Sequence, residues 1–134
     1  MIRSDDTGKL VLRLAVGILV LLHGIAKLSS GVSGISGMLA AHGLPGALAY
    51  LVFIGEILAP VLVIAGIYTR PAAWIMVINM LVAVWLAHGK DLFAIGKNGG
   101  WALELQGMFL FAAVAVAFMG AGRFSVGGTG GRYN

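Results

Sequence analysis

Seven polar side chains interrupt otherwise apolar stretches of this 134-residue sequence. Carboxylates and histidines exchange protons, whereas amides and ammonium groups orient a ligand by hydrogen bonding. A site that pairs His and Glu with aromatic walls suits a quinone, whose reduction couples electrons to protons at an apolar ring. These candidate residues are Glu56, Glu104, His23, His88, Lys27, Asn79 and Gln106.

Other kinds of site find little support. The chain has no cysteine, which excludes disulfides, thiolate metal ligands and cysteine nucleophiles. The two candidate histidines are predicted to lie at different depths, which disfavours a haem between them. No Glu-x-x-His or His-x-x-x-His spacing occurs, so we expect no metal site. Phosphate loops, nucleophile elbows and dinucleotide fingerprints are also absent from the sequence.

The elements that carry these residues are predicted to be membrane-spanning helices. Of all residues, 60% are hydrophobic and only 10% are charged, whereas soluble domains carry about 25% charged residues. Four apolar runs approach the roughly 20 residues that a spanning helix needs. The sequence therefore predicts one all-α membrane domain over residues 1–134, a bundle of four transmembrane helices at residues 10–28, 48–68, 71–87 and 101–119.

The distribution of basic residues predicts the orientation of this bundle. Four spans place both termini on one side, and six basic residues fall there against three on the other side. Positive charge favours the cytoplasmic side, so both termini are predicted to be cytoplasmic. Because the charges are scattered singly at helix ends, the net charge of +4 indicates lipid headgroups rather than nucleic acid. The two sets are Arg3, Lys9, Arg13, Arg70, Arg123 and Arg132 against Lys27, Lys90 and Lys97.

The connections between these helices differ in length. Thr69-Arg70 is predicted to form a tight turn between the second and third helices. Met38-Leu39-Ala40-Ala41 is predicted to form a short interfacial helix. The Gly-rich segment that begins at Ser125 is predicted to be mobile.

With this topology, the candidate residues gather in the outer half of the bundle. Ionisable groups within a span are costly and are therefore functional candidates. His23 and Lys27 lie one turn apart on one helix face. Pro60 follows Glu56 by four residues and removes the N–H that the Glu56 carbonyl would accept, which predicts a kink. Freed backbone at membrane depth needs protein partners or a polar cavity, so we expect a cavity beside Glu56.

Purely structural interpretations remain open at this point. Lys27 and His88 could extend to the outer headgroups. An ion pair of Glu56 with His23 or Lys27 could serve only to fix helix register. Asn79 could be a helix–helix contact.

Several of these motifs, in order and spacing, resemble the DoxX family of small four-helix membrane proteins. The resemblance covers roughly residues 10–125. Two departures, Ala121 in place of the usual proline and Val126-Gly127 in place of a closing aspartate, put a partner contact at the inner end in doubt. The matching motifs are Arg13-Leu14, Gly17, His23-Gly24-x-x-Lys27-Leu28, Glu56, Gly66, Thr69-Arg70-Pro71-Ala72-Ala73, Gly99-Gly100-Trp101 with Glu104, and Gly120-Ala121-Gly122-Arg123-Phe124-Ser125.

The resemblance implies a bacterial or archaeal cytoplasmic-membrane protein, and some relatives are subunits of redox complexes linked to quinone and to sulfur or oxidative-stress chemistry. We therefore expect a quinone-associated subunit that works with a partner protein carrying the electrons. The expected proton-exchanging residues are His23, Glu56 and Glu104. The expected ligand-binding residues are Asn79 and Gln106, which would orient the quinone, and Lys27 and His88, which would form the outer mouth.

Two other classes of function compete with this one. The first is a non-catalytic membrane scaffold or chaperone whose buried polar residues only lock helix pairing. The second is a small proton-coupled transporter that uses Glu56, although four helices without inverted repeats argue against it. The sequence leaves open whether the chain forms a homo-oligomer.

Overall fold

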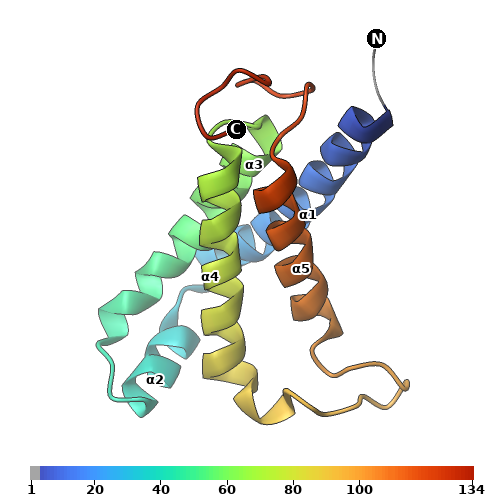
Figure 1. Ribbon diagram of the computed structural model, residues 1–134. Coiled ribbons are helices and arrows are strands. Elements are labelled where there is room, and N and C mark those ends of the chain that lie inside the picture. Colours follow the sequence, from blue (N-terminus) through green and yellow to red (C-terminus); the bar gives the residue numbers. More distant parts are fainter. Residues whose placement is uncertain (1–3) are drawn as a thin grey trace.

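The computed structural model describes residues 4–134, and every extended regular element in this range is helical (Figure 1). Arg3, one of the basic residues used to predict orientation, lies outside the described residues. The predicted all-α class is confirmed. In chain order the elements are α1 (Ser4–Ser30), α2 (Ser33–Ala41), the 3₁₀-helix η1 (Gly46–Leu51), the π-helix η2 (Ile54–Leu58), α3 (Ala59–Ala65), α4 (Thr69–His88), the 3₁₀-helix η3 (Gly89–Asp91) and α5 (Glu104–Met119).

Three helical stretches within the described residues are long and apolar enough to cross a membrane. They are Ser4–Ser30, Gly46–Ala65 and Thr69–Asp91. The second combines η1, η2 and α3. The fourth apolar helix, α5, has 16 residues and is about 24 Å long at 1.5 Å per residue, less than the roughly 30 Å of the hydrocarbon core. The chain is thus an all-helical membrane protein with three long apolar helices and one shorter one.

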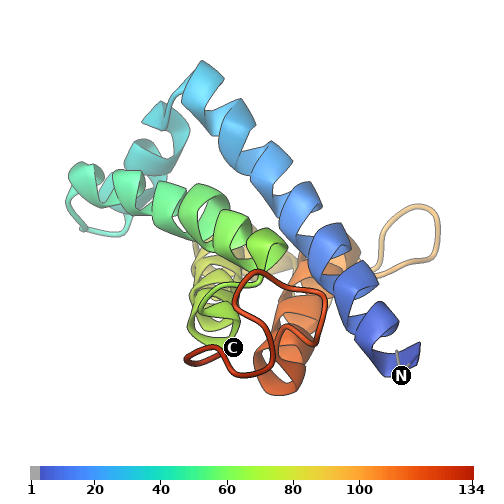
Figure 2. The ribbon, with the colours of Figure 1, turned by 90° about the horizontal axis from the view of Figure 1, so that it is seen from above.

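One hydrophobic core joins four of these helices. Val16 and Val20 of α1, Val63 of α3, Met76 of α4 and Val116 of α5 are all buried in it. The helices α4 and α5 lie side by side (Figure 1), and α1 crosses behind them. Seen from above, α1 and the η1–η2–α3 segment diverge toward the side where α2 lies (Figure 2).

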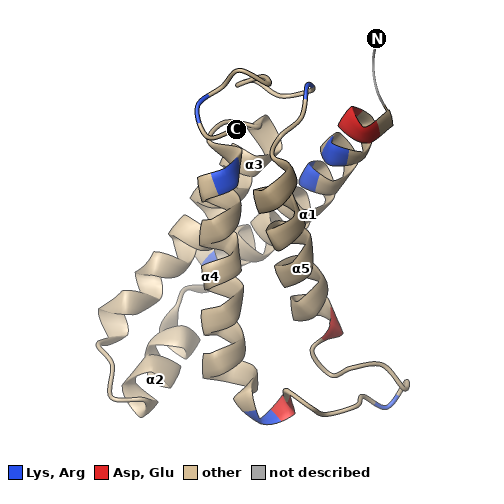
Figure 3. Ribbon diagram, in the orientation of Figure 1, with Lys and Arg blue, Asp and Glu red and all other residues tan. Residues whose placement is uncertain are grey.

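The outer surface of the bundle is apolar, and most of its charges lie at the ends. Phe111 and Phe118 of α5 are 63% and 68% exposed, which water would disfavour and lipid accepts. Figure 3 shows an almost uncharged middle between two charged ends. The start of α1 and the C-terminus lie at one end, here called the terminal end. The loop between α4 and α5 lies at the opposite end, here called the loop end.

The predicted irregularity before Pro60 is present as a π-helix. At the end of η2 the N–H of Ala59 donates to the carbonyl of Ile54, five residues earlier, and Pro60 lies in the first turn of α3. Proline cannot donate a backbone hydrogen bond, so the regular ladder is interrupted beside it. Single π-turns within helices are often found at functional sites. Here the π-turn contains Glu56.

The turn between α3 and α4 differs from the prediction. Thr69 and Arg70 are the first residues of α4, and the connection is made by residues 66–68. The helix α3 ends before Gly66, whose φ of 75° lies in the left-handed region that glycine favours. Gly66 and Ile67 both donate backbone N–H bonds to the carbonyl of Leu62. This closure leaves the last carbonyls of α3 in need of other donors.

Two arginines at the terminal end supply donors to such helix ends. The buried Arg13 guanidinium donates to the carbonyls of Val63 and Ile64 at 3.0 Å each. It also donates to those of Ala121 at 2.6 Å and Phe124 at 2.9 Å. Arg13 thereby fastens α1 to the end of α3 and to the chain that follows α5.

Arg70 has the corresponding role at the end of α5. Its guanidinium donates to the carbonyls of Ala117 at 3.3 Å, Phe118 at 2.5 Å and Met119 at 3.4 Å. A positive side chain is also favourable at the negative end of a helix dipole. Arg13 and Arg70, which the sequence presented as interfacial charges, are therefore structural.

The C-terminal segment was predicted to be mobile, but in the structure it is docked on the bundle. The Asn134 side chain accepts a hydrogen bond from the Thr69 hydroxyl at 2.6 Å and donates one to the Gly128 carbonyl at 2.9 Å. The Asn134 carbonyl accepts from the N–H of Ala121 at 2.8 Å. The glycines of this segment suggested mobility, but side chains and backbone distant in sequence bind it to the ends of α4 and α5.

Candidate ligand cavity

A cavity of about 670 Å³ lies among α1, α2, η1, η2, α4 and α5. Ligand pockets in proteins commonly measure about 300–1,000 Å³ and combine apolar walls with a few polar groups. This cavity has that composition, because most of its lining is aliphatic. Six of the seven predicted site residues line it: His23, Lys27, Glu56, Asn79, His88 and Gln106.

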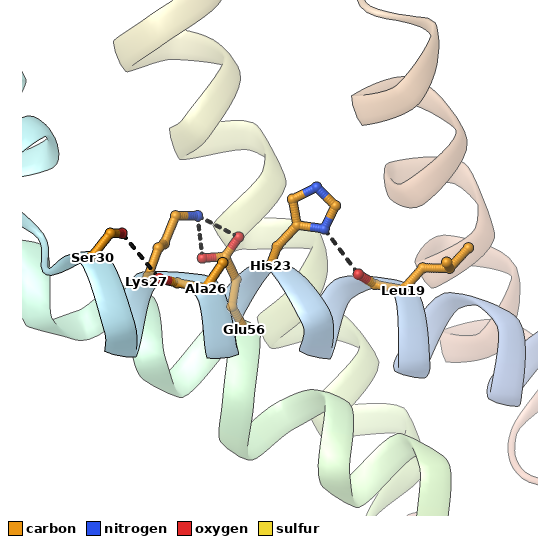
Figure 4. A network of polar contacts seen from close by, with 6 residues as sticks. All are labelled: Leu19, His23, Ala26, Lys27, Ser30 and Glu56. Carbon is orange, nitrogen blue, oxygen red and sulfur yellow. Dashed lines mark hydrogen bonds and ion pairs between the residues drawn. The ribbon is translucent and has the colours of Figure 1, made fainter.

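The centre of the polar wall is an ion pair between α1 and η2. The Lys27 ammonium donates to both carboxylate oxygens of Glu56, at 2.7 Å to Oε1 and 2.5 Å to Oε2 (Figure 4). Glu56 is 3% exposed, whereas the Lys27 side chain is 31% exposed. Of the two partners considered for Glu56, the structure selects Lys27, so this lysine does not simply extend to the headgroups. The pair gives the buried carboxylate the counter-charge that burial requires.

A close contact between two backbones brings this pair together. At Gly24 a Cβ atom would lie 2.8 Å from the Glu56 carbonyl carbon and 2.7 Å from Ile57 Cγ1. Only the missing side chain lets α1 approach η2 so closely. Since Lys27 is three residues after Gly24, it extends from the same face of α1 toward the carboxylate.

Asn79 of α4 packs directly against η2. A Cβ atom on Gly55 would lie 2.5 Å from the Cβ and 2.6 Å from the Cγ of Asn79. The Asn79 amide nitrogen is buried, and no hydrogen-bond acceptor for it occurs among residues 4–134. The helix–helix contact considered for Asn79 is therefore real. It leaves a polar donor beside the cavity without a protein partner.

His23 lines the cavity and is itself exposed. Its Nδ1 lies 2.9 Å from the carbonyl oxygen of Leu19. A carbonyl can only accept, so Nδ1 carries the hydrogen and the neutral ring has its acceptor at Nε2. The ring meets Phe109 of α5 edge to face, with centroids 5.5 Å apart. In Figure 4 it extends from α1 on the same side as the Lys27 amine.

His88 and Gln106 meet at the loop end of the cavity. The Gln106 amide nitrogen lies 3.4 Å from His88 Nε2. Since the amide nitrogen can only donate, Nε2 accepts and the hydrogen belongs on Nδ1. That nitrogen lies 3.9 Å from the carboxylate of Asp91, which is partly exposed. The structure thus joins the predicted mouth residue His88 to Gln106, which was predicted to orient the ligand, and it adds Asp91.

Glu104 does not belong to this group. We expected Glu104 to exchange protons together with His23 and Glu56, but its side chain is exposed and does not line the cavity. The helix α5 begins at Glu104 rather than at Trp101. A Cβ on Gly100 would lie 2.5 Å from the Glu104 carboxylate, so the side chain bends back toward the preceding loop. A carboxylate in the first turn is favourable to the helix dipole, which is a structural role.

The lining also contains residues that the sequence prediction did not include, and Phe109 is one of them. Phe109 is buried, contacts the His23 ring and forms an aromatic part of the wall. Its signal was its position three residues after Gln106, which puts both on one face of α5. Within residues 4–134, no three His, Asp or Glu side chains come together as a metal ion would need.

The arrangement offers hydrogen-bond donors and a base that is not already paired with a cation, within apolar walls. The donors are the Lys27 ammonium and the Asn79 amide, and the base is His23 Nε2. Such a set can bind oxygen atoms on an otherwise apolar molecule and can exchange a proton with one of them.

Comparison with known proteins places the chain in a family. The DoxX family profile matches residues 8–89. An uncharacterised protein of Haemophilus influenzae is 34% identical over 115 residues, covering 83% of this chain and 81% of that protein. A Bacillus subtilis protein named "Putative oxidoreductase CatD" is 31% identical over 110 residues, covering 82% of this chain and 81% of its own length. No solved structure matches. The chain belongs to the DoxX family.

Proposed function

We propose that this protein is a quinone-associated subunit of a membrane redox system, with the quinone ring bound in the cavity. The observation that carries the proposal is the convergence of six polar side chains from α1, η2, α4 and α5 on one apolar cavity. Polar groups within membrane spans are costly and are retained mainly where they bind or react. The oxidoreductase name of the Bacillus subtilis relative is in keeping with this proposal.

The cavity residues fit a ring that carries oxygen atoms. The Asn79 amide nitrogen has no hydrogen-bond acceptor among residues 4–134. A carbonyl oxygen of the bound ring would accept its hydrogen bond. Lys27 uses two hydrogen bonds on Glu56 and retains a third N–H. Phe109 and the aliphatic walls suit the apolar body of such a ring.

A bound quinone would supply reversible two-electron, two-proton redox chemistry. His23 would take a proton from a ligand hydroxyl at Nε2, because Nδ1 is occupied by the Leu19 carbonyl. Glu56 would take the second proton when Lys27 moves aside. Asn79 and Gln106 would orient the ring, and His88 would stand at the mouth toward the loop end.

The electrons require a partner protein in this proposal. The chain has no cysteine with which to hold an iron–sulfur cluster. We further propose that α5 is a fourth span in the cytoplasmic membrane and that the terminal end is cytoplasmic. The six-to-three division of basic residues supports this orientation.

A single substitution tests the proton role. Glu56→Gln keeps the shape of Glu56 and an acceptor for Lys27, but it cannot titrate. We expect the purified variant to remain folded in detergent while proton-coupled reduction of a bound quinone, or growth of a complemented strain under oxidative stress, falls at least about tenfold. His23→Gln should show a similar defect.

The matched control is Glu104→Gln, which removes a carboxylate outside the cavity and should leave function unchanged. A folded Glu56→Gln protein with full function would refute the proton role. That result would favour the scaffold, which the closed Lys27–Glu56 pair supports because both its charges are satisfied within the fold.

A further inference from the structure

The apolar lining of the cavity includes residues of η1 and of α4, and the part of the cavity between them is here called the lateral groove. Its walls are Leu48 and Leu51 of η1 and Ile78 and Val82 of α4. Spacings of three and four residues place each pair on one helix face. Gly55 and Asn79, which are in close contact, line the same cavity.

The walls of the lateral groove reach the outer surface of the bundle. Leu51 is 56% exposed, Ile78 60% and Val82 44%, although all three line the cavity. Both walls belong to stretches long and apolar enough to span a membrane. Surface exposed at that depth meets lipid tails, so the groove opens sideways into the bilayer.

The helix α2 covers the loop end of the same groove. Ile35, Met38 and Leu39 of α2 line the cavity. Beyond them, the His42 ring packs on Trp85 of α4, with centroids 4.6 Å apart. This cover stands between the lateral groove and the water at the loop end, while the side toward lipid has no such cover in the described residues.

We propose that the lateral groove holds the hydrocarbon tail of a membrane-dissolved ligand whose polar head lies against Asn79, Lys27 and His23. The inference rests on the proposed quinone site and extends it, because it specifies a tailed quinone that enters from the bilayer. A small water-soluble ring would leave the groove walls unused. A tail in the groove exchanges contacts with lipid tails for contacts with the packed protein wall.

Two native tryptophans provide a matched optical test. Trp85 lines the cavity and is 54% exposed, whereas Trp74 of the same helix is 42% exposed and does not line it. Two single-tryptophan proteins are compared: Trp74→Phe with Trp101→Phe, and Trp85→Phe with Trp101→Phe. Both lose the bond from Trp101 to the Leu92 carbonyl, so that effect cancels.

Each protein is titrated in detergent with a decyl-tailed benzoquinone and with the same ring lacking the tail. We expect the tailed quinone to quench Trp85 saturably and to quench Trp74 only in proportion to its total concentration. Val82→Phe narrows the groove. It should weaken the binding affinity for the tailed quinone roughly tenfold, and the affinity for the tailless ring less than about threefold. Leu81→Phe, on the adjacent lipid-facing position, should change neither.

The outcomes separate this inference from the proposed function. Equal effects of Val82→Phe on both quinones would overturn the tail groove while leaving the ring site standing. If neither quinone binds, the same proteins are titrated with a phospholipid whose tails are brominated, to test whether the groove holds a hydrocarbon tail. Saturable quenching of Trp85 that Val82→Phe abolishes would uphold the groove and reject the quinone, and no saturable quenching would reject both.

Discussion

Gly24 is the residue on which the geometry of the polar wall depends. It lies where α1 crosses η2, and any side chain there would collide with the carbonyl oxygen of Glu56. The same crossing brings the Lys27 ammonium to both Glu56 oxygens. A residue without functional groups therefore sets the distance between the two charges.

Gly24→Ala tests this dependence. We expect a loss of about 1–3 kcal/mol in the free energy of unfolding, because the added Cβ meets backbone that cannot move aside cheaply. The control is Gly8→Ala on the same helix, where no atom lies within 4 Å of the added Cβ. That change should be neutral or stabilise by up to about 1 kcal/mol through helix propensity.

Thermal unfolding in detergent measures both variants. Equal stability of the two would show that α1 and η2 do not hold this separation in the folded protein.

At the scale of elements, the helix ends explain most of the family motifs. Arg13 donates hydrogen bonds to the last carbonyls of α3, and Arg70 donates hydrogen bonds to the last carbonyls of α5. The backbone N–H groups of Val126 and Gly127 complete α3 by donating to the carbonyls of Ala65 and Gly66. These motifs at the terminal end thus close helices, whereas the His23 and Lys27 motif borders the cavity.

Arg13→Met should be among the most damaging substitutions in the chain. It leaves four carbonyls without their donor in a buried site, and charged hydrogen bonds contribute about 1.5–3 kcal/mol each. We expect a loss of more than about 3 kcal/mol, with Arg13→Lys intermediate because one ammonium cannot reproduce the planar fork. Expression level and thermal unfolding in detergent report the effect.

Arg132→Met is the control for lost positive charge. Arg132 is exposed and lies over the Tyr133 ring at 5.2 Å, so the change should stay within about 0.5 kcal/mol. A stable Arg13→Met protein would mean that water can satisfy these carbonyls.

At the scale of the whole molecule, the distribution of charges and the arrangement of the chain both distinguish two ends. The start of α1, the turn before α4 and the C-terminus lie at the terminal end, and the loop between α4 and α5 lies at the other (Figure 3). The cavity, with its pair at Lys27, lies toward the loop end.

We predict that the terminal end faces the cytoplasm. A reporter joined by a flexible linker after Asn134 should read cytoplasmic, and one inserted after Lys97 should read the opposite side, because basic residues are retained inside. The linker is needed because Asn134 is bound to Thr69. An outside signal from the C-terminal reporter would show that the orientation is the reverse of the one predicted. Signals from the same side at both positions would show that α5 does not span the membrane.

The sequence by itself determined that the outer surface of this protein meets lipid, and it identified six polar residues that line the cavity. Long apolar runs leave lipid as the medium for the outer surface, and polar residues inside them are too costly to be incidental. His23, Lys27, Glu56 and Asn79 could therefore be found by position alone. Pro60 also predicted the irregular backbone, since a missing N–H is a local property.

Tertiary structure decided which of these groups meet and how the helices end. Periodicity gives the face of a residue on its own helix, but the pairing of Glu56 with Lys27 required the approach of α1 at Gly24. Glu104 left the site because α5 begins there, and the terminal segment was fixed by Asn134 binding a distant Thr69. Arg13 looked like an interfacial charge because its partners are backbone carbonyls, which every residue has and which sequence alone cannot single out.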